Sequence, residues 1–465
     1  MMFYKSTRGS SEELSFKEVT LTGLASDGGL YVPRDWNNLK YLKKKRNRTF
    51  QDVIYFVISQ FIGNSIDKNI LKKIIKNSYD NFSSKEITPL QNIKSNHSIL
   101  ELFHGPTLAF KDIALQLLGN LFNYYLEEDS KHLTIIGATS GDTGSAAIEA
   151  VKGVKNINIF ILHPYNRVSE FQRRQMTTVK NNNVFNIAVK GNFDDCQAIV
   201  KNLFQDKLLN KKIKLGSINS INWTRIMAQI SYYIYAFSKI QDYKFNKNVV
   251  FSVPTGNFGD AYAGYLALAK FKVPIKKIIV ATNKNDILDR FFKSGRYSKR
   301  KVVETISPSM DIQVASNFER LLYDLNSSNG RVIYEAMKHF KENDYIQIDN
   351  EQLIKASNIF CSYSVTEKET IDTMKTIYNN NSIILDPHTA VGVKASENYM
   401  KKDKDSHIIT LATAHPSKFS GSVRKAIGIK PNLPKNFSNI LKLVEKYEVL
   451  DNNYETIRDF ILFKS

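Results

Sequence analysis

The sequence predicts an α/β protein with largely parallel sheets. From about residue 99 onward, short apolar runs alternate with longer amphipathic stretches. Runs of four to six apolar residues fit strands that are buried on both faces, and the stretches between them fit helices. Strands and helices in alternation are typical of parallel sheets joined by helical crossovers.

Residues 1–98 are expected to form a separate, mixed α/β unit. Residues 26–29 (SDGG) carry a turn signal, and residues 30–33 (LYVP) fit a short extended run after it. Residues 67–79 have a helical pattern.

The strands and helices that follow are predicted from their apolar patterns. The strands are LTIIG (133–137), INIFIL (157–162), VVFSV (249–253), IIVA (278–281) and IITLA (408–412). Helices are expected over 145–152, 224–240 and 261–271. Ligands of parallel sheets bind at the carboxyl ends of strands, so the loops after these runs are where we expect a functional site.

Composition bounds the class of protein. The chain has 465 residues, 42% of them hydrophobic and 24% charged, which is ordinary for a globular protein of about three structural units. An apolar run of about 18 residues is absent from the sequence, and the N-terminus has no apolar block typical of a signal peptide. Cys196 and Cys361 lie far apart, which fits a reducing cytoplasm. A metal site is not expected.

The formal net charge of +20 raises the possibility of nucleic-acid binding. Basic residues are spread along the chain, with one dense run at Lys43, Lys44, Lys45, Arg46 and Arg48. We therefore favour a solvated basic surface, which would still attract a small anionic ligand.

Lys111 is the first candidate for chemistry. It follows a Gly-Pro turn, Thr107 as a candidate helix cap, and the apolar residues Ala109 and Phe110. A lysine in apolar surroundings can lose its proton near neutral pH, and a neutral amine is what Schiff-base formation requires. The segment alone also fits a surface lysine at the start of a helix.

Two further loops lie between a predicted strand and a predicted helix. In VPTGNFGD (253–260), glycines before a helix N-terminus would let backbone N–H groups bind a phosphate. GATSGDTGSAA (137–147) is rich in hydroxyls and backbone donors and would suit a carboxylate. Its glycine spacing fits neither the dinucleotide fingerprint nor the P-loop. Either loop could also be an ordinary turn.

Several blocks of the sequence resemble motifs of the threonine synthase family. They are, in the family's order, YKSTRG, GLASDGGLYVP, ELFHGPTLAFKD, GATSGDTGSAA, SINSINWTRI, VPTGNFGD, ATNKNDILDRF, ILDPHTAVG and ATAHPSKF. The blocks span nearly the whole chain, and the resemblance is to the long subgroup with an extra N-terminal domain.

The resemblance implies a fold and a reaction. The fold would be pyridoxal-phosphate (PLP) fold type II, tryptophan synthase β-like, with two α/β lobes of open parallel sheets and an N-terminal α/β domain. Residues 1–98 would form the N-terminal domain and 99–465 the catalytic domain, with a smaller mobile lobe at about 133–222. The enzyme would be a carbon–oxygen lyase acting on phosphates. It would convert O-phospho-L-homoserine and water into L-threonine and phosphate by β,γ-replacement, the last step of threonine biosynthesis. A cytoplasmic monomer or homodimer, without nucleic-acid or membrane partners, is expected.

The resemblance also assigns roles by position. Lys111 matches the Schiff-base lysine, and Thr413 matches the hydroxyl residue that faces the pyridine nitrogen. The loop that grips the cofactor phosphate matches Gly256, Asn257, Phe258, Gly259 and Asp260. The loop that receives the substrate carboxylate matches Ser140, Gly141, Asp142 and Thr143. Asn222 and Arg225 are further candidates for substrate contact.

Some motif residues stand apart from these roles. His104, His388 and His415 are expected to make local hydrogen bonds rather than take part in chemistry. Glu170 stands where the family usually has proline, and Thr255 stands where serine is common.

Two alternatives remain open on the sequence alone. One is another PLP lyase of the same fold, such as a threonine or serine dehydratase. The other is a catalytically silent relative that binds nucleic acid through its basic surface.

Overall fold

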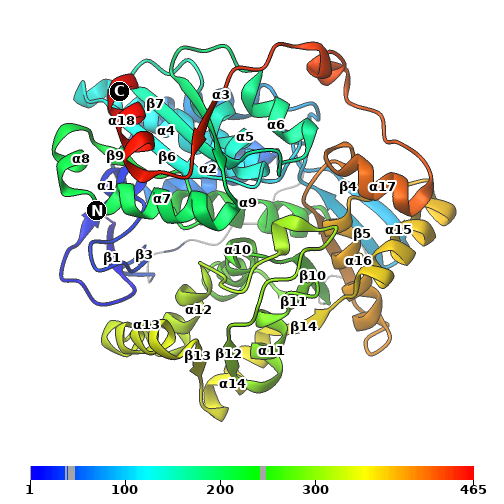
Figure 1. Cartoon of the computed structure of the whole chain (residues 1–465). Coiled ribbons are helices and arrows are strands. Elements are labelled where there is room, and N and C mark those ends of the chain that lie inside the picture. Colours follow the sequence, from blue (N-terminus) through cyan, green and yellow to red (C-terminus); the bar gives the residue numbers. More distant parts are fainter. Residues whose placement is uncertain (1, 37–38, 40–47, 241–247) are drawn as a thin grey trace.

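The computed structural model describes residues 2–36, 39, 48–240 and 248–465, and it contains two largely parallel sheets surrounded by helices (Figure 1). The predicted α/β class with largely parallel sheets is confirmed. Most of the dense basic run, Lys43 to Arg46, lies outside the described residues.

The larger sheet has six strands in the order β14-β11-β10-β15-β5-β4. Their bounds are β4 Leu90–Lys94, β5 His97–Glu101, β10 Val249–Pro254, β11 Ile275–Thr282, β14 Phe360–Ser364 and β15 His407–Ala412. Neighbouring strands are parallel, except that β4 and β5 are antiparallel. The central strands β10 and β15 are buried at every residue, which explains their unbroken apolar runs.

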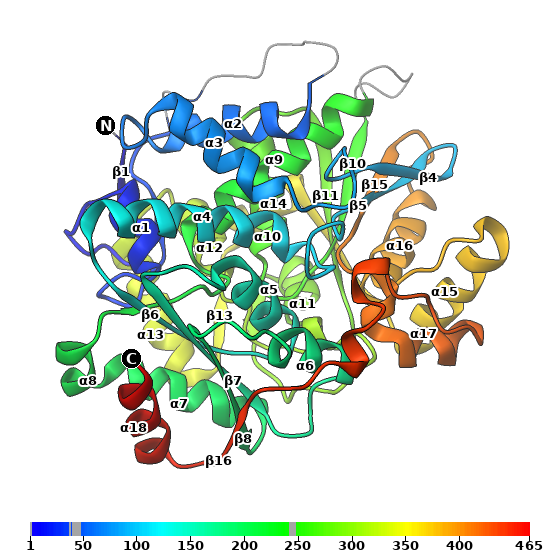
Figure 2. The same ribbon diagram turned by 90° about the horizontal axis from the view of Figure 1, so that it is seen from above.

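The smaller sheet is parallel throughout, in the order β16-β8-β7-β6-β9. The strands are β6 Leu133–Ala138, β7 Ile157–Pro164, β8 Val184–Lys190, β9 Leu215–Gly216 and β16 Glu448–Asp451. The last strand arrives from the far end of the chain: after α17 (Ser420–Ile427), the backbone crosses to this sheet and ends in α18 (Tyr454–Lys464) (Figure 2). Arg173 of α6 (Glu170–Thr177) donates to Glu445 at 2.8 and 2.9 Å and fastens the crossing segment.

The N-terminal part has its own small antiparallel sheet, in the order β2-β1-β3. Its elements are β1 Phe3–Ser6, β2 Leu14–Ser15, α1 Phe16–Thr22, β3 Tyr31–Pro33, α2 Phe50–Phe61 and α3 Lys68–Tyr79. Arg8 and Thr7 bind Glu319 of α12 (Phe318–Leu325), with contacts of 2.6 to 3.0 Å. The proposed division at residue 98 stays a prediction, and it falls within β5.

Helices α4 (Lys111–Asp129), α5 (Asp142–Val151) and α9 (Trp223–Ile240) form the interior layer around the site. Helix α4 packs on α3, α5 and α9, and α9 also packs on α2 and α10. Almost every residue of α9 is buried, since it is covered on all sides. The remaining elements are α7 Phe193–Gln205, α8 Lys207–Lys212, α10 Gly259–Ala269, α11 Ile287–Ser294, β12 Arg296–Ser298, α12 Phe318–Leu325, α13 Gly330–Asn343, β13 Tyr345–Gln347, α14 Asn350–Ile359, α15 Glu367–Asn381 and α16 Pro387–Met400.

All five strands predicted after residue 99 and the four predicted helices are present, with ends that differ by a few residues. One local prediction is wrong. Thr107 does not cap α4, which begins only at Lys111; its hydroxyl instead donates to Asp112 at 2.6 Å. Within the described ranges, none of the helices is long and apolar enough to cross a membrane.

Candidate active site

Lys111 lies where the loop before α4 meets the loop after β15. Backbone hydrogen bonds fasten the two loops together: the N–H of Phe110 donates to the carbonyl of Thr413 at 2.8 Å, and that of His415 donates to Leu108 at 3.0 Å. The structure therefore brings Lys111 and Thr413, which are 302 positions apart in the numbering (413 minus 111), into one site.

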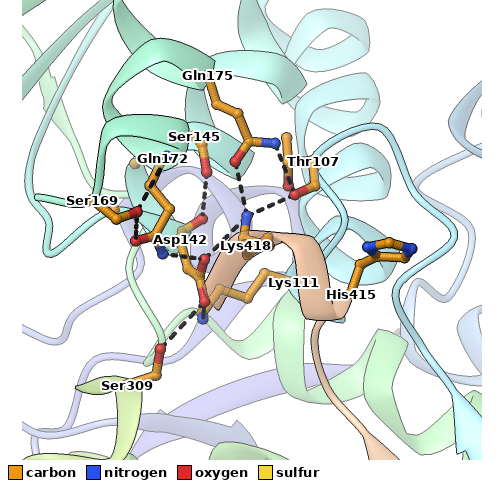
Figure 3. Close-up of polar contacts among 12 residues, drawn as sticks. Thr107, Lys111, Asp142, Ser145, Ser169, Gln172, Gln175, Ser309, His415 and Lys418 are labelled. Atoms are coloured by element: carbon orange, nitrogen blue, oxygen red, sulfur yellow. Dashed lines mark hydrogen bonds and ion pairs between the residues drawn. The ribbon is translucent and has the colours of Figure 1, made fainter. Parts of the chain in front are cut away.

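The Lys111 side chain is buried, with 11% of its surface exposed. Its Nζ lies 3.2 Å from Oδ2 of Asp142 (Figure 3). Burial lowers the pKa of Lys111, and the nearby charges of Lys418 and Arg225 lower it further, while Asp142 acts in the opposite direction. Lys111 is also the first residue of α4, where the positive end of the helix dipole disfavours a cation. The surroundings thus make Lys111 easier to deprotonate than an exposed lysine.

Asp142 comes from the predicted loop at residues 137–147, at the carboxyl end of β6. Thr139 accepts the N–H groups of Gly141 and Gly144 at 2.9 Å, which shapes the turn. Gly141 has φ +136°, and a Cβ there would come within 2.8 Å of Gln172, so the turn requires glycine. Asp142 then begins α5, where the helix dipole favours a carboxylate.

The Asp142 carboxylate is held by four side chains. Oδ1 accepts from Gln172 at 2.7 Å and lies 3.1 Å from Lys418 Nζ, whereas Oδ2 accepts from Ser309 and Lys111 at 3.2 Å. Burial opposes ionisation of Asp142, but the Lys111 and Lys418 side chains that face it, together with the hydrogen bond from Gln172, hold its pKa well below the ordinary value. A permanent anion therefore lies beside Lys111.

Lys418 was not among the residues predicted from the sequence. It lies in the short 3-10 helix Pro416–Phe419 after β15, and its side chain has no exposed surface. Its position in ATAHPSKF, just beyond the carboxyl end of a buried strand, was the available signal, but its partners come from distant segments.

The loop of residues 256–260 connects β10 with α10. Phe258 adopts a left-handed conformation (φ +63°) and is buried against Phe292, Phe318 and Phe360. No side chain of the described residues caps α10, so the N–H groups of its first turn remain available for an anion. A Cβ at Gly256 would come within 2.7 Å of the Ser309 carbonyl, so this position also requires glycine.

Asp260, predicted to bind the cofactor, turns its carboxylate into the protein. Oδ1 accepts the hydroxyls of Tyr232 and Tyr233, the latter at 2.9 Å. Burial raises the pKa of Asp260 to about 6. Its contribution is therefore to anchor the start of α10 on α9.

The two further candidates, Asn222 and Arg225, differ in how many of their polar atoms form hydrogen bonds. Asn222 has both polar atoms engaged: its amide donates to Thr20 at 2.9 Å and its oxygen accepts from Thr224 at 3.0 Å. Arg225 is 3% exposed, and neither Nε nor Nη1 finds a hydrogen-bond partner among the described residues. A buried guanidinium without an anion suits a negatively charged ligand.

The remaining predicted residues lie around these. Ser140 is exposed at the turn before α5, and Thr143 is partly buried in its first turn. Thr413 is buried, and within the described part of the chain its hydroxyl has no hydrogen bond. The structure also places His388 beneath the site, with Nδ1 2.9 Å from Asp386 and Nε2 accepting from the Ser309 N–H at 3.1 Å.

Comparison with family models matches three regions of the chain. Residues 3–79 match the threonine synthase N terminus, residues 88–357 match the pyridoxal-phosphate dependent enzymes, and residues 389–461 match the threonine synthase C-terminal model. The fold is thus that of the PLP enzymes of fold type II, as the sequence motifs implied.

Two relatives that match nearly the whole chain are both threonine synthases. The chain is 45% identical to the threonine synthase of Pseudomonas aeruginosa over 463 residues, covering 99% of this chain and 98% of that one. It is 44% identical to the threonine synthase of Saccharomyces cerevisiae, covering 96% and 95%.

Solved structures also show similarity to threonine synthase. A PLP-bound threonine synthase from Brucella melitensis matches with a TM-score of 0.95 and 40% identity over 100% of both chains. A threonine deaminase from Solanum lycopersicum reaches a TM-score of 0.51 at 15% identity, covering 80% of this chain and 86% of that one, and shares the fold alone.

Proposed function

This chain belongs to the threonine synthase family, and from that premise we propose that it converts O-phospho-L-homoserine and water into L-threonine and inorganic phosphate with PLP bound at Lys111. The proposal makes it a carbon–oxygen lyase acting on phosphates. The observation that carries it is the buried Lys111 amine, which lies 3.2 Å from Asp142 between three strand–helix loops.

The residues of the site fit PLP. An aldehyde needs a free amine, and the surroundings of Lys111 lower its pKa and so ease the loss of its proton. A phosphate needs cationic and N–H donors, which the unpaired Arg225 and the uncapped N-terminus of α10 provide. A pyridine nitrogen needs a polar partner, and the Thr413 hydroxyl is available. We propose Lys111, Gly256, Asn257, Phe258, Gly259 and Thr413 as the cofactor site, with Asp260 anchoring the loop from behind.

When bound, PLP supplies an electron sink that makes protons beside the substrate amine acidic. The amine of Lys111 is then the base that takes the Cα proton of the substrate and returns protons later in the reaction. Thr413, being a neutral hydroxyl, supports the ring nitrogen less strongly than a carboxylate would, which favours elimination and replacement over transamination.

The loop of residues 140–143 would receive the substrate carboxylate. Ser140 and Thr143 have the side chains that are free to turn toward it, whereas the Asp142 carboxylate is already bound to Lys111 and Lys418. We propose that the substrate carboxylate binds the hydroxyls and backbone N–H groups of this loop rather than the side chain of Asp142, since two carboxylates would repel each other.

Closure of the smaller lobe, at about residues 133–222, would exclude water until it is added to the substrate. The lobe carries the Asp142 loop and α6, so its movement would bring Gln172 and Ser140 over the ligand. Limited proteolysis with and without a substrate analogue tests this; an unchanged cleavage pattern counts against closure.

We also propose a cytoplasmic monomer or homodimer that binds no nucleic acid. Many of the basic side chains form ion pairs with neighbouring acids, for example Lys17 with Asp129 and Lys276 with Asp403. The positive charge is thus partly neutralised locally.

The function is tested by offering three substrates to the PLP-loaded protein. Phosphate and L-threonine from O-phospho-L-homoserine are expected, with little ketoacid from L-serine or L-threonine. Ketoacid production from the latter pair, without phosphate release from the first, would identify a dehydratase instead. Lys111→Ala is the control, and it should be inactive on all three.

A further inference from the structure

We propose that Lys418 is a positioning residue: it keeps the proton in the buried Lys418–Asp142–Lys111 cluster and so leaves Lys111 as the free amine. This rests on the proposed role of Lys111 in binding PLP. The cluster lies where the α4 N-terminus, the α5 N-terminus and the Pro416–Phe419 turn meet (Figure 3).

The hydrogen-bond partners distinguish the two lysines. An ammonium has three N–H groups to satisfy. Lys418 finds three acceptors: Oδ1 of Asp142 at 3.1 Å, the carbonyl of Thr107 at 2.7 Å and Oε1 of Gln175 at 2.9 Å. Among the described residues, Lys111 has one acceptor, Oδ2 of Asp142 at 3.2 Å. Only Lys418 therefore has the surroundings of a fully satisfied cation.

Charge balance leads to the same assignment. The cluster holds one carboxylate and two amines, and the Lys418 side chain has no exposed surface through which water could compensate a second positive charge. Asp142 stays ionised because Gln172 and Ser309 also donate to it. One anion neutralises one ammonium, so a net neutral cluster requires that one lysine gives up its proton.

The other charged groups around Lys111 do not change this balance. Arg225 adds positive charge from α9. Asp112, next in sequence, accepts the N–H and hydroxyl of Thr107 at 2.8 and 2.6 Å, and the charged partner of its carboxylate is Lys418. His388 accepts an N–H from Ser309 through Nε2 at 3.1 Å, and its Nδ1 lies 2.9 Å from Asp386. Lys111 therefore shares its single counter-ion with Lys418.

Without the charge of Lys418, Asp142 would be the counter-ion of Lys111 alone and would stabilise Lys111 as an ammonium. That form cannot attack an aldehyde. Loss of the second cation would also remove a like charge that disfavours protonation of Lys111. Both effects act in the same direction, so covalent binding of PLP should require a higher pH.

The test measures the pH at which PLP becomes attached. The full-length protein is incubated with PLP over a range of pH, the C=N bond is reduced with borohydride, and the fraction of Lys111 that carries the tag is read by peptide mass spectrometry. Lys418→Met should move the midpoint upward by about one pH unit or more. Lys418→Gln can keep two of the hydrogen bonds without the charge and should give the same shift, which provides a second variant if the first does not fold.

Three further proteins complete the design. Lys418→Arg keeps the charge and should stay near the wild-type midpoint. In Asp142→Asn combined with Lys418→Met, the anion that retains the proton on Lys111 is gone, and the midpoint should return to the wild-type value or below. Lys190→Met removes an exposed lysine whose partner, Asp451, is also exposed, and it is the matched control without effect.

An unchanged midpoint in both Lys418→Met and Lys418→Gln would overturn the inference, as would an upward shift that persists in the double variant. These results differ from a failure of the proposed function. In that case, the wild-type protein itself would carry no tag on Lys111 at any pH.

Discussion

Lys111 and Asp142, the first residues of α4 and α5, face each other with Nζ and Oδ2 3.2 Å apart. The two helix N-termini act oppositely on them, since a positive dipole end disfavours the lysine cation and favours the carboxylate. The pair is thus biased toward an amine beside an anion, and Lys418 provides the cation that this anion needs.

Asp142→Asn should cost about 3–5 kcal/mol of unfolding free energy at pH 7, because it leaves Lys418 buried without a counter-ion. In the native protein the pKa of Asp142 is held below its ordinary value. Its contribution is therefore present above the unfolded pKa and is lost as the pH falls through the native one. Urea unfolding from pH 7 downward should show the gap between variant and wild type narrowing in acid. The double variant with Lys418→Met should cost less than the sum of the single changes; strict additivity would contradict the coupling.

Arg225→Met should weaken PLP binding about 10- to 100-fold, the range expected for loss of one or two charge-assisted hydrogen bonds. The same change should raise the thermal midpoint of the protein without PLP, because the guanidinium is buried and two of its nitrogens have no partner within the described residues.

Arg320→Met is the contrasting control for stability. Arg320 is also buried, but it donates to the carbonyls of Tyr31 and Ile221, so its removal should lower the thermal midpoint. If Arg225→Met lowered the midpoint as well and left PLP affinity unchanged, Arg225 would be a structural residue.

The unfolding free energy of Asp260→Asn, relative to that of the wild type, should increase as the pH rises. Burial raises the pKa of Asp260 to about 6, so the group stabilises the fold below its unfolded pKa, and this contribution is lost as the pH rises through 6. Asparagine can accept both tyrosine hydroxyls without titrating. Between pH 5 and 7.5, the unfolding free energy of the variant minus that of the wild type should increase by roughly 1 kcal/mol.

Asp194→Asn, which alters an exposed aspartate of α7, controls for the loss of a surface carboxylate. Undiminished PLP affinity in Asp260→Asn is expected as well. A large loss of affinity would show that the carboxylate itself contacts the ligand.

Thr413→Asp should increase side products relative to L-threonine, because a carboxylate would keep the ring nitrogen protonated and strengthen the electron sink. Thr413→Ser keeps the hydroxyl and should leave the product ratio close to that of the wild type. The measurement is the ratio of ketoacid to L-threonine formed from O-phospho-L-homoserine. An unchanged ratio in Thr413→Asp would contradict the role of the neutral hydroxyl.

Much of the fold could be predicted because buried parallel strands leave continuous apolar runs. Residues 249–253 and 408–412 were predicted as strands, and both lie at the centre of the larger sheet. Asp142 follows the strand predicted at 133–137, whereas the strand before Lys111, β5, was not among the predicted strands. Helix starts were less accurate: Thr107 has the composition of a cap, yet its hydroxyl is used by Asp112.

The orientation of side chains could not be predicted from the motifs. Asp260 and Asn222 lie in motifs rich in polar residues, yet Asp260 binds Tyr232 and Tyr233 and Asn222 binds Thr20. Lys418 was overlooked because its partners Asp142, Thr107 and Gln175 come from other segments, and only the tertiary structure brings them together.

The most direct test of the central claim is to locate the covalently bound cofactor. The PLP-loaded protein is reduced with borohydride, digested and analysed by mass spectrometry. The tag should lie on Lys111, and Lys111→Ala should carry none while remaining folded. A tag on Lys418, or on any other side chain of the wild-type protein, would contradict the account.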